Sequence, residues 1–181
     1  MSMSPPWLVI ALAATVATWP AQSPGRSAPA QLTVDGVVLP LRGEARRTAL
    51  LGTVVLYQLG LFSTRGPDAE SLAPASVAKA VRVEVAYEPD PERRVPRDWR
   101  HELIPPLAPD AVAHLRGSFA PLRRGDVVLV EYTPARGTFV RVNRAVAVSG
   151  AHHGLMLAFL DHWLGDRPVS EAIKHALLAS P

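Results

Sequence analysis

Apolar and polar side chains alternate with a period of two in several parts of the chain, and this period predicts β-strands. Residues 32–39 place apolar side chains on both sides of Asp35-Gly36, which is a strong short-range signal for a β-hairpin. Over residues 81–85 valines alternate with charged side chains, so we expect a strand with one buried and one solvated face.

Two more strand regions follow from the same pattern. The mostly apolar run over residues 50–62 predicts a buried strand that continues or bends at Gly52 or Gly60. Residues 128–132 and 140–142 alternate on either side of a short turn. They are expected to form a second hairpin.

Apolar side chains recur at helical spacing between and after these strands. Residues 99–119 carry one such stripe, with Asp110 placed to cap a helix. Residues 155–163 carry a broader stripe that Gly165 is expected to end, and Ser170 can cap a last helix. A sheet with one face covered by helices gives an α+β architecture.

Length and composition bound the classes of function. The 181 residues suit a single domain, and residues 88–97 are expected to form an exposed loop within it. A net charge of +3 comes from basic residues scattered in pairs, whereas nucleic-acid binding needs a denser stripe, so we expect no nucleic-acid partner. The absence of cysteine excludes disulfides, thiol catalysis and thiolate metal sites.

The N-terminal segment has the pattern of a signal peptide. Residues 7–16 are apolar and uncharged, Pro20 follows, and Ala28-Pro29-Ala30 is a small-residue cleavage site. The apolar run is shorter than the roughly 20 residues that span a bilayer as a helix, so no membrane span is expected after signal removal. We therefore predict a signal and processing region over residues 1–30 and a periplasmic or secreted domain over residues 31–181, with an uncleaved anchor as the alternative.

An ordered set of motifs runs through the chain: Val34 to Pro40, Leu56-Tyr57, Gly125-Asp126, Pro134 to Gly137 and Trp163 to Pro168. With these motifs the chain resembles the bacterial secreted branch of the chalcone isomerase-like family. The resemblance implies an open-faced β-sandwich, in which a large antiparallel sheet is covered on one face by a helical layer. It also implies that a ligand cleft lies between the sheet and the helices.

The resemblance also indicates two ligand-binding residues. In the family an arginine after a glycine-rich turn holds an anion, and the segment from Gly43 to Arg47 falls at that place, with Arg47 favoured over Arg46 by its spacing to the next strand. Tyr57 falls where bacterial members commonly have tyrosine. An arginine binds a carboxylate or phenolate with two parallel hydrogen bonds, and a phenol can donate beside it. The alternative is that Tyr57 packs in the core with its hydroxyl satisfied and that both arginines only solubilise an edge strand.

Other positions depart from the plant enzymes of this family, which cyclise a chalcone to a flavanone. Those enzymes have a tyrosine and an asparagine on one helix, but residues 96–106 contain neither and have Trp99, His101 and Glu102 instead. Related non-catalytic members bind fatty acids through an arginine and a tyrosine. We therefore expect a non-catalytic binder of a small amphipathic anion, such as a fatty or aromatic acid.

Two other functions stay open: an isomerase of the intramolecular lyase type that acts on a chalcone-like phenolic enone, and a structural protein that docks a partner. No cofactor is expected, because the chain has no phosphate-binding glycine loop. No metal is expected either. His152, His153 and His162 are the closest to a ligand set, but adjacent histidines on a helix point about 100° apart and no carboxylate lies at ligand spacing.

Overall fold

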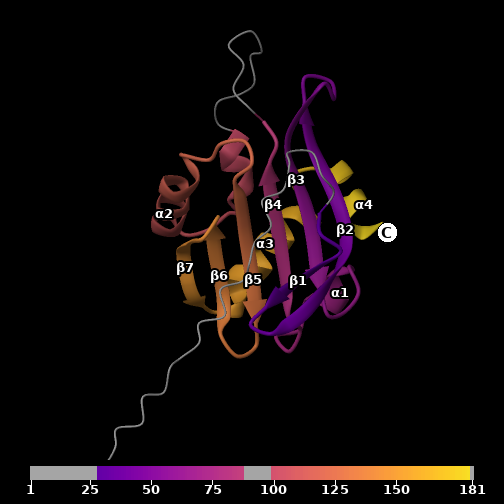
Figure 1. The fold of residues 1–181 in the computed structure, drawn as a ribbon, viewed down its shortest axis with the longest axis vertical. Helices are drawn as coiled ribbons and strands as arrows, with labels where there is room; N and C mark the ends of the chain where they lie inside the picture. The colour runs from indigo at the N-terminus through magenta and orange to yellow at the C-terminus, as the bar shows by residue number, and fades with distance from the viewer. Residues whose placement is uncertain (1–27, 88–98, 180–181) are drawn as a thin grey trace, which may run out of the picture.

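The structure is a computed structural model that describes residues 28–87 and 99–179. Its centre is an antiparallel sheet of seven strands, each paired with the next along the chain (Figure 1). The strands are β1 Gln31–Val34, β2 Val37–Ala49, β3 Val54–Ser63, β4 Lys79–Val85, β5 Val127–Thr133, β6 Gly137–Val142 and β7 Ala145–Ala151. Both predicted hairpins are present, as β1–β2 and β5–β6, whereas β7 was not predicted.

Helices cover one face of this sheet, which confirms the α+β class and the open-faced β-sandwich. The helices are α1 Ala69–Leu72, the 3-10 helix η1 Trp99–Leu103, α2 Pro109–Phe119, α3 His153–Leu164 and α4 Glu171–Leu178. In Figure 1, α3 and α4 lie behind the sheet, where α3 packs on β5 and β6 and α4 packs on β2. The main hydrophobic core fills the space between the sheet and these helices, so this side is called the inner face.

Local chemistry sets the ends of the helices. The Ser170 hydroxyl accepts a hydrogen bond from the backbone N–H of Ile173 and caps α4, and Gly165 follows the last residue of α3, both as predicted. The predicted cap at Asp110 is wrong. Ala108 precedes α2, Pro109 begins it, and Asp110 lies in its first turn, where a carboxylate favours the positive end of the helix dipole.

The apolar run over residues 50–62 is not one strand. Residues 50–53 form the turn between β2 and β3, and Leu50, Leu51 and Gly52 have φ angles of 50°, 55° and 88°. Apolar character alone could not reveal this turn, because glycine is the residue expected at positive φ and two leucines stand there instead.

The outer face of the sheet is less solvated than the pattern predicted. Arg82 and Glu84 on β4 are only 4% and 3% exposed, and their side chains form an ion pair at 2.7 Å. The prediction of a solvated face on this strand is therefore wrong.

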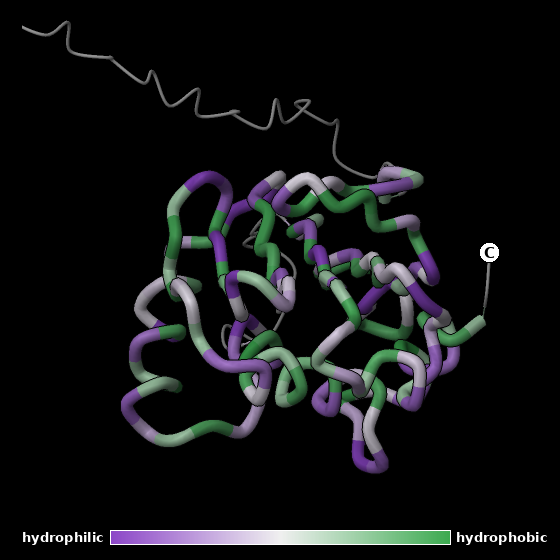
Figure 2. The backbone as a smooth tube through the Cα atoms, turned by 90° about the horizontal axis from the view of Figure 1, so that it is seen from below, coloured by the Kyte–Doolittle hydropathy of each residue, from purple (hydrophilic) through white to green (hydrophobic). Residues whose placement is uncertain are grey.

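Part of this face is covered by the β1–β2 hairpin, which builds a second apolar cluster. That cluster comprises Val34, Leu39, Phe62, Ala78, Ala80 and Leu129. The carboxylate of Asp35 at the hairpin turn accepts hydrogen bonds from Thr133 and Arg136 at the β5–β6 turn. Figure 2, which views the molecule from below, shows hydrophobic and hydrophilic positions alternating along the chain.

Gly43 lies within β2, beside an irregularity in its pairing with β3, so the segment from Gly43 to Arg47 is strand rather than the expected turn. Its lack of a side chain has a packing reason. A Cβ atom on Gly43 would lie 1.9 Å from the carbonyl oxygen of Leu177. The glycine therefore allows α4 to approach the sheet next to the predicted site.

The predicted loop over residues 88–97 lies outside the described residues, and so does the signal region up to residue 27. Of the signal region, residues 28–30 are described: Ala28 packs on the second apolar cluster, and the carbonyl of Ala30 accepts a hydrogen bond from the N–H of Leu41 at 2.8 Å. Within residues 28–87 and 99–179, no helix is long and apolar enough to cross a membrane.

Candidate functional site

The structure brings the two predicted site residues together. Arg47 on β2 and Tyr57 on β3 are direct partners across the antiparallel pair, so their side chains lie on the same face of the sheet. Tyr57 belongs to the core between sheet and helices, and this face is therefore the inner one.

A bulge in β3 helps to set this geometry. The register between β2 and β3 shifts immediately after the Arg47–Tyr57 pair, so that Leu56 has no partner on β2. The carbonyl of Leu56 instead accepts hydrogen bonds from the backbone N–H groups of Ala86 and Tyr87, at 2.9 and 3.0 Å. Bulges bend a strand and re-aim neighbouring side chains, and they are frequent beside functional sites.

Arg47 is already paired with a carboxylate of its own chain. Its Nε and Nη2 atoms donate to Oε2 and Oε1 of Glu102 at 2.8 and 3.1 Å. The hydrogen bonds that Arg47 donates to Glu102 raise the pKa of Arg47 above its usual value, so the guanidinium is charged at any physiological pH. Glu102 was expected only as a departure from the plant pattern, because no local signal joins residues 55 positions apart.

Tyr57 is fully buried, its hydroxyl proton has no acceptor among the described residues, and the guanidinium of Arg47 interacts with the hydroxyl oxygen. Burial raises the pKa of this phenol, the negative charge of Glu102 raises it further, and the guanidinium of Arg47 opposes both. The phenol is therefore a neutral donor. The burial of the ring agrees with the alternative of a core tyrosine, but the hydroxyl proton lacks the acceptor that this alternative expects among the described residues.

Two aromatic rings form a chain that begins at Tyr57. The ring of Trp99 stacks on Tyr57 with centroids 6.0 Å apart, and the ring of Tyr87 meets Trp99 edge-on at 6.4 Å. Trp99 and Glu102 are both on η1, which is held to α3 by a 2.7 Å hydrogen bond between the His162 ring and the carbonyl of Glu102. One short helix thus supplies both an apolar wall and the carboxylate that faces Arg47.

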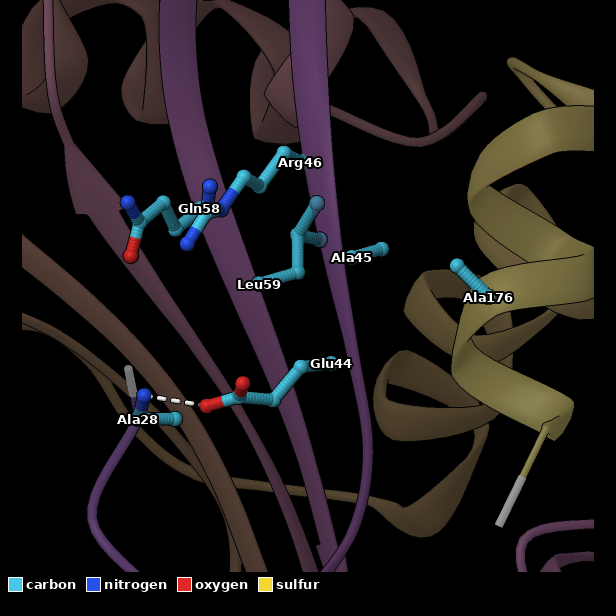
Figure 3. Close-up of a pocket in the computed structure, with 7 residues that line it drawn as sticks. All are labelled: Ala28, Glu44, Ala45, Arg46, Gln58, Leu59 and Ala176. Carbon is cyan, nitrogen blue, oxygen red and sulfur yellow. Dashed lines mark hydrogen bonds between the residues drawn. The ribbon is translucent and has the colours of Figure 1, made fainter. Parts of the chain in front are cut away.

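Arg46 lies on the opposite face from Arg47. It is exposed, pairs with Gln58 across the strands, and lines a cavity of about 350 Å³ together with Glu44 and Ala28 (Figure 3). In Figure 3 the side chain of Ala45 points the other way, towards α4. The structure thus separates the two arginines by face, and it places only Arg47 beside Tyr57.

The histidines have separate surroundings. His162 binds the carbonyl of Glu102, whereas the ring of His153 lies 4.5 Å from that of Tyr132, and burial lowers the pKa of His153. Within the described part of the chain, no group of three or more His, Asp or Glu side chains is placed to hold a metal ion.

Comparison with known proteins shows the family. Residues 21–179 match the model of the chalcone isomerase-like family, and the chain belongs to this family. Its structure is similar to the crystal structure of a fatty-acid binding protein from Arabidopsis thaliana. The TM-score is 0.54 at 18% sequence identity, and the match covers 86% of this chain and 92% of the other. No curated protein matches the sequence. The structural similarity shows a common fold.

Proposed function

We propose that this protein is an exported, non-catalytic binder of a small amphipathic anion, with Arg47 and Tyr57 as donors to its head group. The observation that carries the proposal is the Tyr57 hydroxyl, which is buried beside a guanidinium and has no acceptor among the described residues. A carboxylate or phenolate oxygen at this point would satisfy the phenol and bind the arginine together. The fold shared with a fatty-acid binding protein supports a ligand of this class.

The proposal requires the ligand to replace Glu102 as the partner of Arg47. Both side chains of this pair are 31% exposed, and ion pairs with such access to water typically contribute about 0.2–1 kcal/mol. A buried hydroxyl without a partner costs about 1–3 kcal/mol. Replacement of Glu102 by the ligand is therefore favourable. The Glu102 carboxylate is released towards water, while the ligand accepts hydrogen bonds from both Arg47 and Tyr57.

The apolar part of the ligand is proposed to lie against the aromatic rings around Tyr57. Trp99 is stacked on Tyr57, and Tyr87 closes the edge of the same group. Aromatic rings offer a large apolar area with few rotatable bonds, which suits either a hydrocarbon chain or an aromatic acid.

The test is a titration with a medium-chain fatty acid that follows tryptophan fluorescence. Trp99 is stacked on Tyr57, so its emission should change when a ligand binds there. Arg47→Ala removes a charge-assisted donor and is expected to weaken binding about ten- to a hundredfold. Tyr57→Phe removes a neutral donor and should weaken binding less. Arg46→Ala is the matched control, since this arginine is next in sequence but on the other face, and it should bind like the wild type. Equal effects of the two alanine variants would contradict the proposed site.

Export belongs to the same proposal and rests on the apolar run and the small-residue site near the N-terminus. We propose that the mature protein begins near Gln31, and the intact mass of protein from a periplasmic extract tests this. Retention of residues 1–30 in that fraction would favour an anchor. If the mature protein began upstream of Ala28, it would keep the hydrogen bond that the N–H of Ala28 donates to the carboxylate of Glu44.

A further inference from the structure

The turn between β2 and β3 presents two leucines to solvent. Leu51 is fully exposed and Leu50 is 42% exposed, and Figure 1 shows this turn extending beyond the rest of the sheet at the upper end. Thr48 and Thr53, which flank the turn, are exposed as well. Residues 48–53 are called the leucine tip below.

The leucine tip is also strained. Leu50 and Leu51 both have positive φ angles, at 50° and 55°, where the side chain of a non-glycine residue crowds the backbone. The turn is closed by hydrogen bonds from the N–H groups of Gly52 and Thr53 to the carbonyls of Ala49 and Leu50, at 3.1 and 3.2 Å. Hairpin turns with successive positive φ angles are usually occupied by asparagine and glycine. Strain combined with full exposure gives the folded protein no benefit, so it points to a role outside the fold.

From this geometry we infer that the leucine tip inserts into the surface of a lipid bilayer. Two side chains on a convex turn offer far less area than the roughly 1,200 Å² of a specific protein interface. They suit a bilayer, which accepts a small apolar insertion without a complementary pocket.

The charges around the tip support the same partner. No charged residue occurs over residues 48–63, so nothing opposes entry of the tip into the apolar boundary of the lipid. Arg46 stands at the base of the tip and is exposed, and its side chain forms no hydrogen bond or ion pair with the part of the chain that the structure describes. A cation at the base of an inserted tip lies near the head groups and attracts the phosphates of anionic lipids.

Docking in this way would bring the ligand site to the membrane surface. Arg47 on β2 precedes Leu50 in the turn by three residues, which at the rise of a strand is about 10 Å. Interfacial segments enter lipid by about 5–10 Å, so Arg47 and Tyr57 would stand near the head groups, where an amphipathic anion enters or leaves the bilayer. This consequence rests on the proposed function, whereas the docking itself does not.

The experiment is flotation of the mature protein proposed above, without the apolar run of residues 1–30, which would itself bind lipid. The vesicles contain phosphatidylethanolamine and phosphatidylglycerol, and no ligand is added. The double substitution Leu50→Asn with Leu51→Gly supplies the residues that the turn favours, so it should raise thermal stability while it reduces vesicle binding by about tenfold or more. Leu157→Gln removes an exposed leucine from α3 and is the matched control, which should still bind.

Three results would overturn the inference. The first is that the wild type does not float with the vesicles. The second is that the double variant floats as well as the wild type. The third is that Leu157→Gln loses as much binding as the double variant. A solution titration of the double variant with the medium-chain acid separates the two proposals, because its affinity there should be unchanged. A loss of that affinity would assign the tip to the ligand site itself and would also overturn the inference.

Discussion

Glu102 is expected to compete with the ligand for Arg47, so its neutralisation should strengthen binding. The substitution Glu102→Gln keeps the size of the side chain but removes the charge that holds the guanidinium at 2.8 Å. At 31% exposure a contribution of about 1 kcal/mol is expected for the pair, which corresponds to a gain in affinity of about fivefold for an anionic ligand. The stability of the folded protein should fall by no more than the same amount.

The assay is the fluorescence titration with a medium-chain acid, performed on Glu102→Gln and on a matched control. Glu131→Gln is that control, because Glu131 also pairs with an arginine, Arg141 at 2.6 Å, but on the outer face. Affinity should rise for the first variant and stay constant for the second. Weaker binding by Glu102→Gln would show that this carboxylate positions Arg47 for the ligand, and it would refute the exchange.

Three further outcomes are expected. Gly43→Ala should lower the free energy of unfolding in urea by about 3 kcal/mol because its Cβ meets backbone at 1.9 Å, whereas Gly117→Ala, with open space inside α2, should raise it by up to about 1 kcal/mol. Burial lowers the pKa of Lys79 to about 8, so the folded state binds this proton less tightly than the unfolded state. Unfolding free energy should therefore rise from pH 8 towards 10, and Lys79→Met should flatten that rise. Chalcone cyclisation should show little or no acceleration over the spontaneous reaction, measured by loss of chalcone absorbance, and a rate enhancement of several orders of magnitude would make the protein an isomerase.

Features set by neighbours in sequence could be predicted from it. The hairpin at Asp35-Gly36, the cap at Ser170 and the end of α3 at Gly165 each depend on a few adjacent residues, and all three are present. The pairing of Arg47 with Tyr57 was accessible through the family resemblance, which located both residues without any coordinates.

Features set by distant parts of the chain could not be predicted. Glu102 reaches Arg47 across 55 positions, and nothing near either residue signals the contact. Arg82 and Glu84 have the alternation of a solvated face, yet tertiary packing buries both and pairs them with each other. The turn at residues 50–53 could not be predicted for another reason. Its leucines extend an apolar run whose remaining residues form a strand.

Discrimination between an acid and its ester tests the central claim most directly. A medium-chain fatty acid and its methyl ester share the same tail, but only the acid presents a charged carboxylate to Arg47 and Tyr57. Titration of the wild-type protein should give an affinity for the acid at least about tenfold higher than for the ester, as expected for loss of one charge-assisted hydrogen bond. Equal affinities would mean that no anion site exists at this pair of strands, and Arg47 would then serve only its ion pair with Glu102.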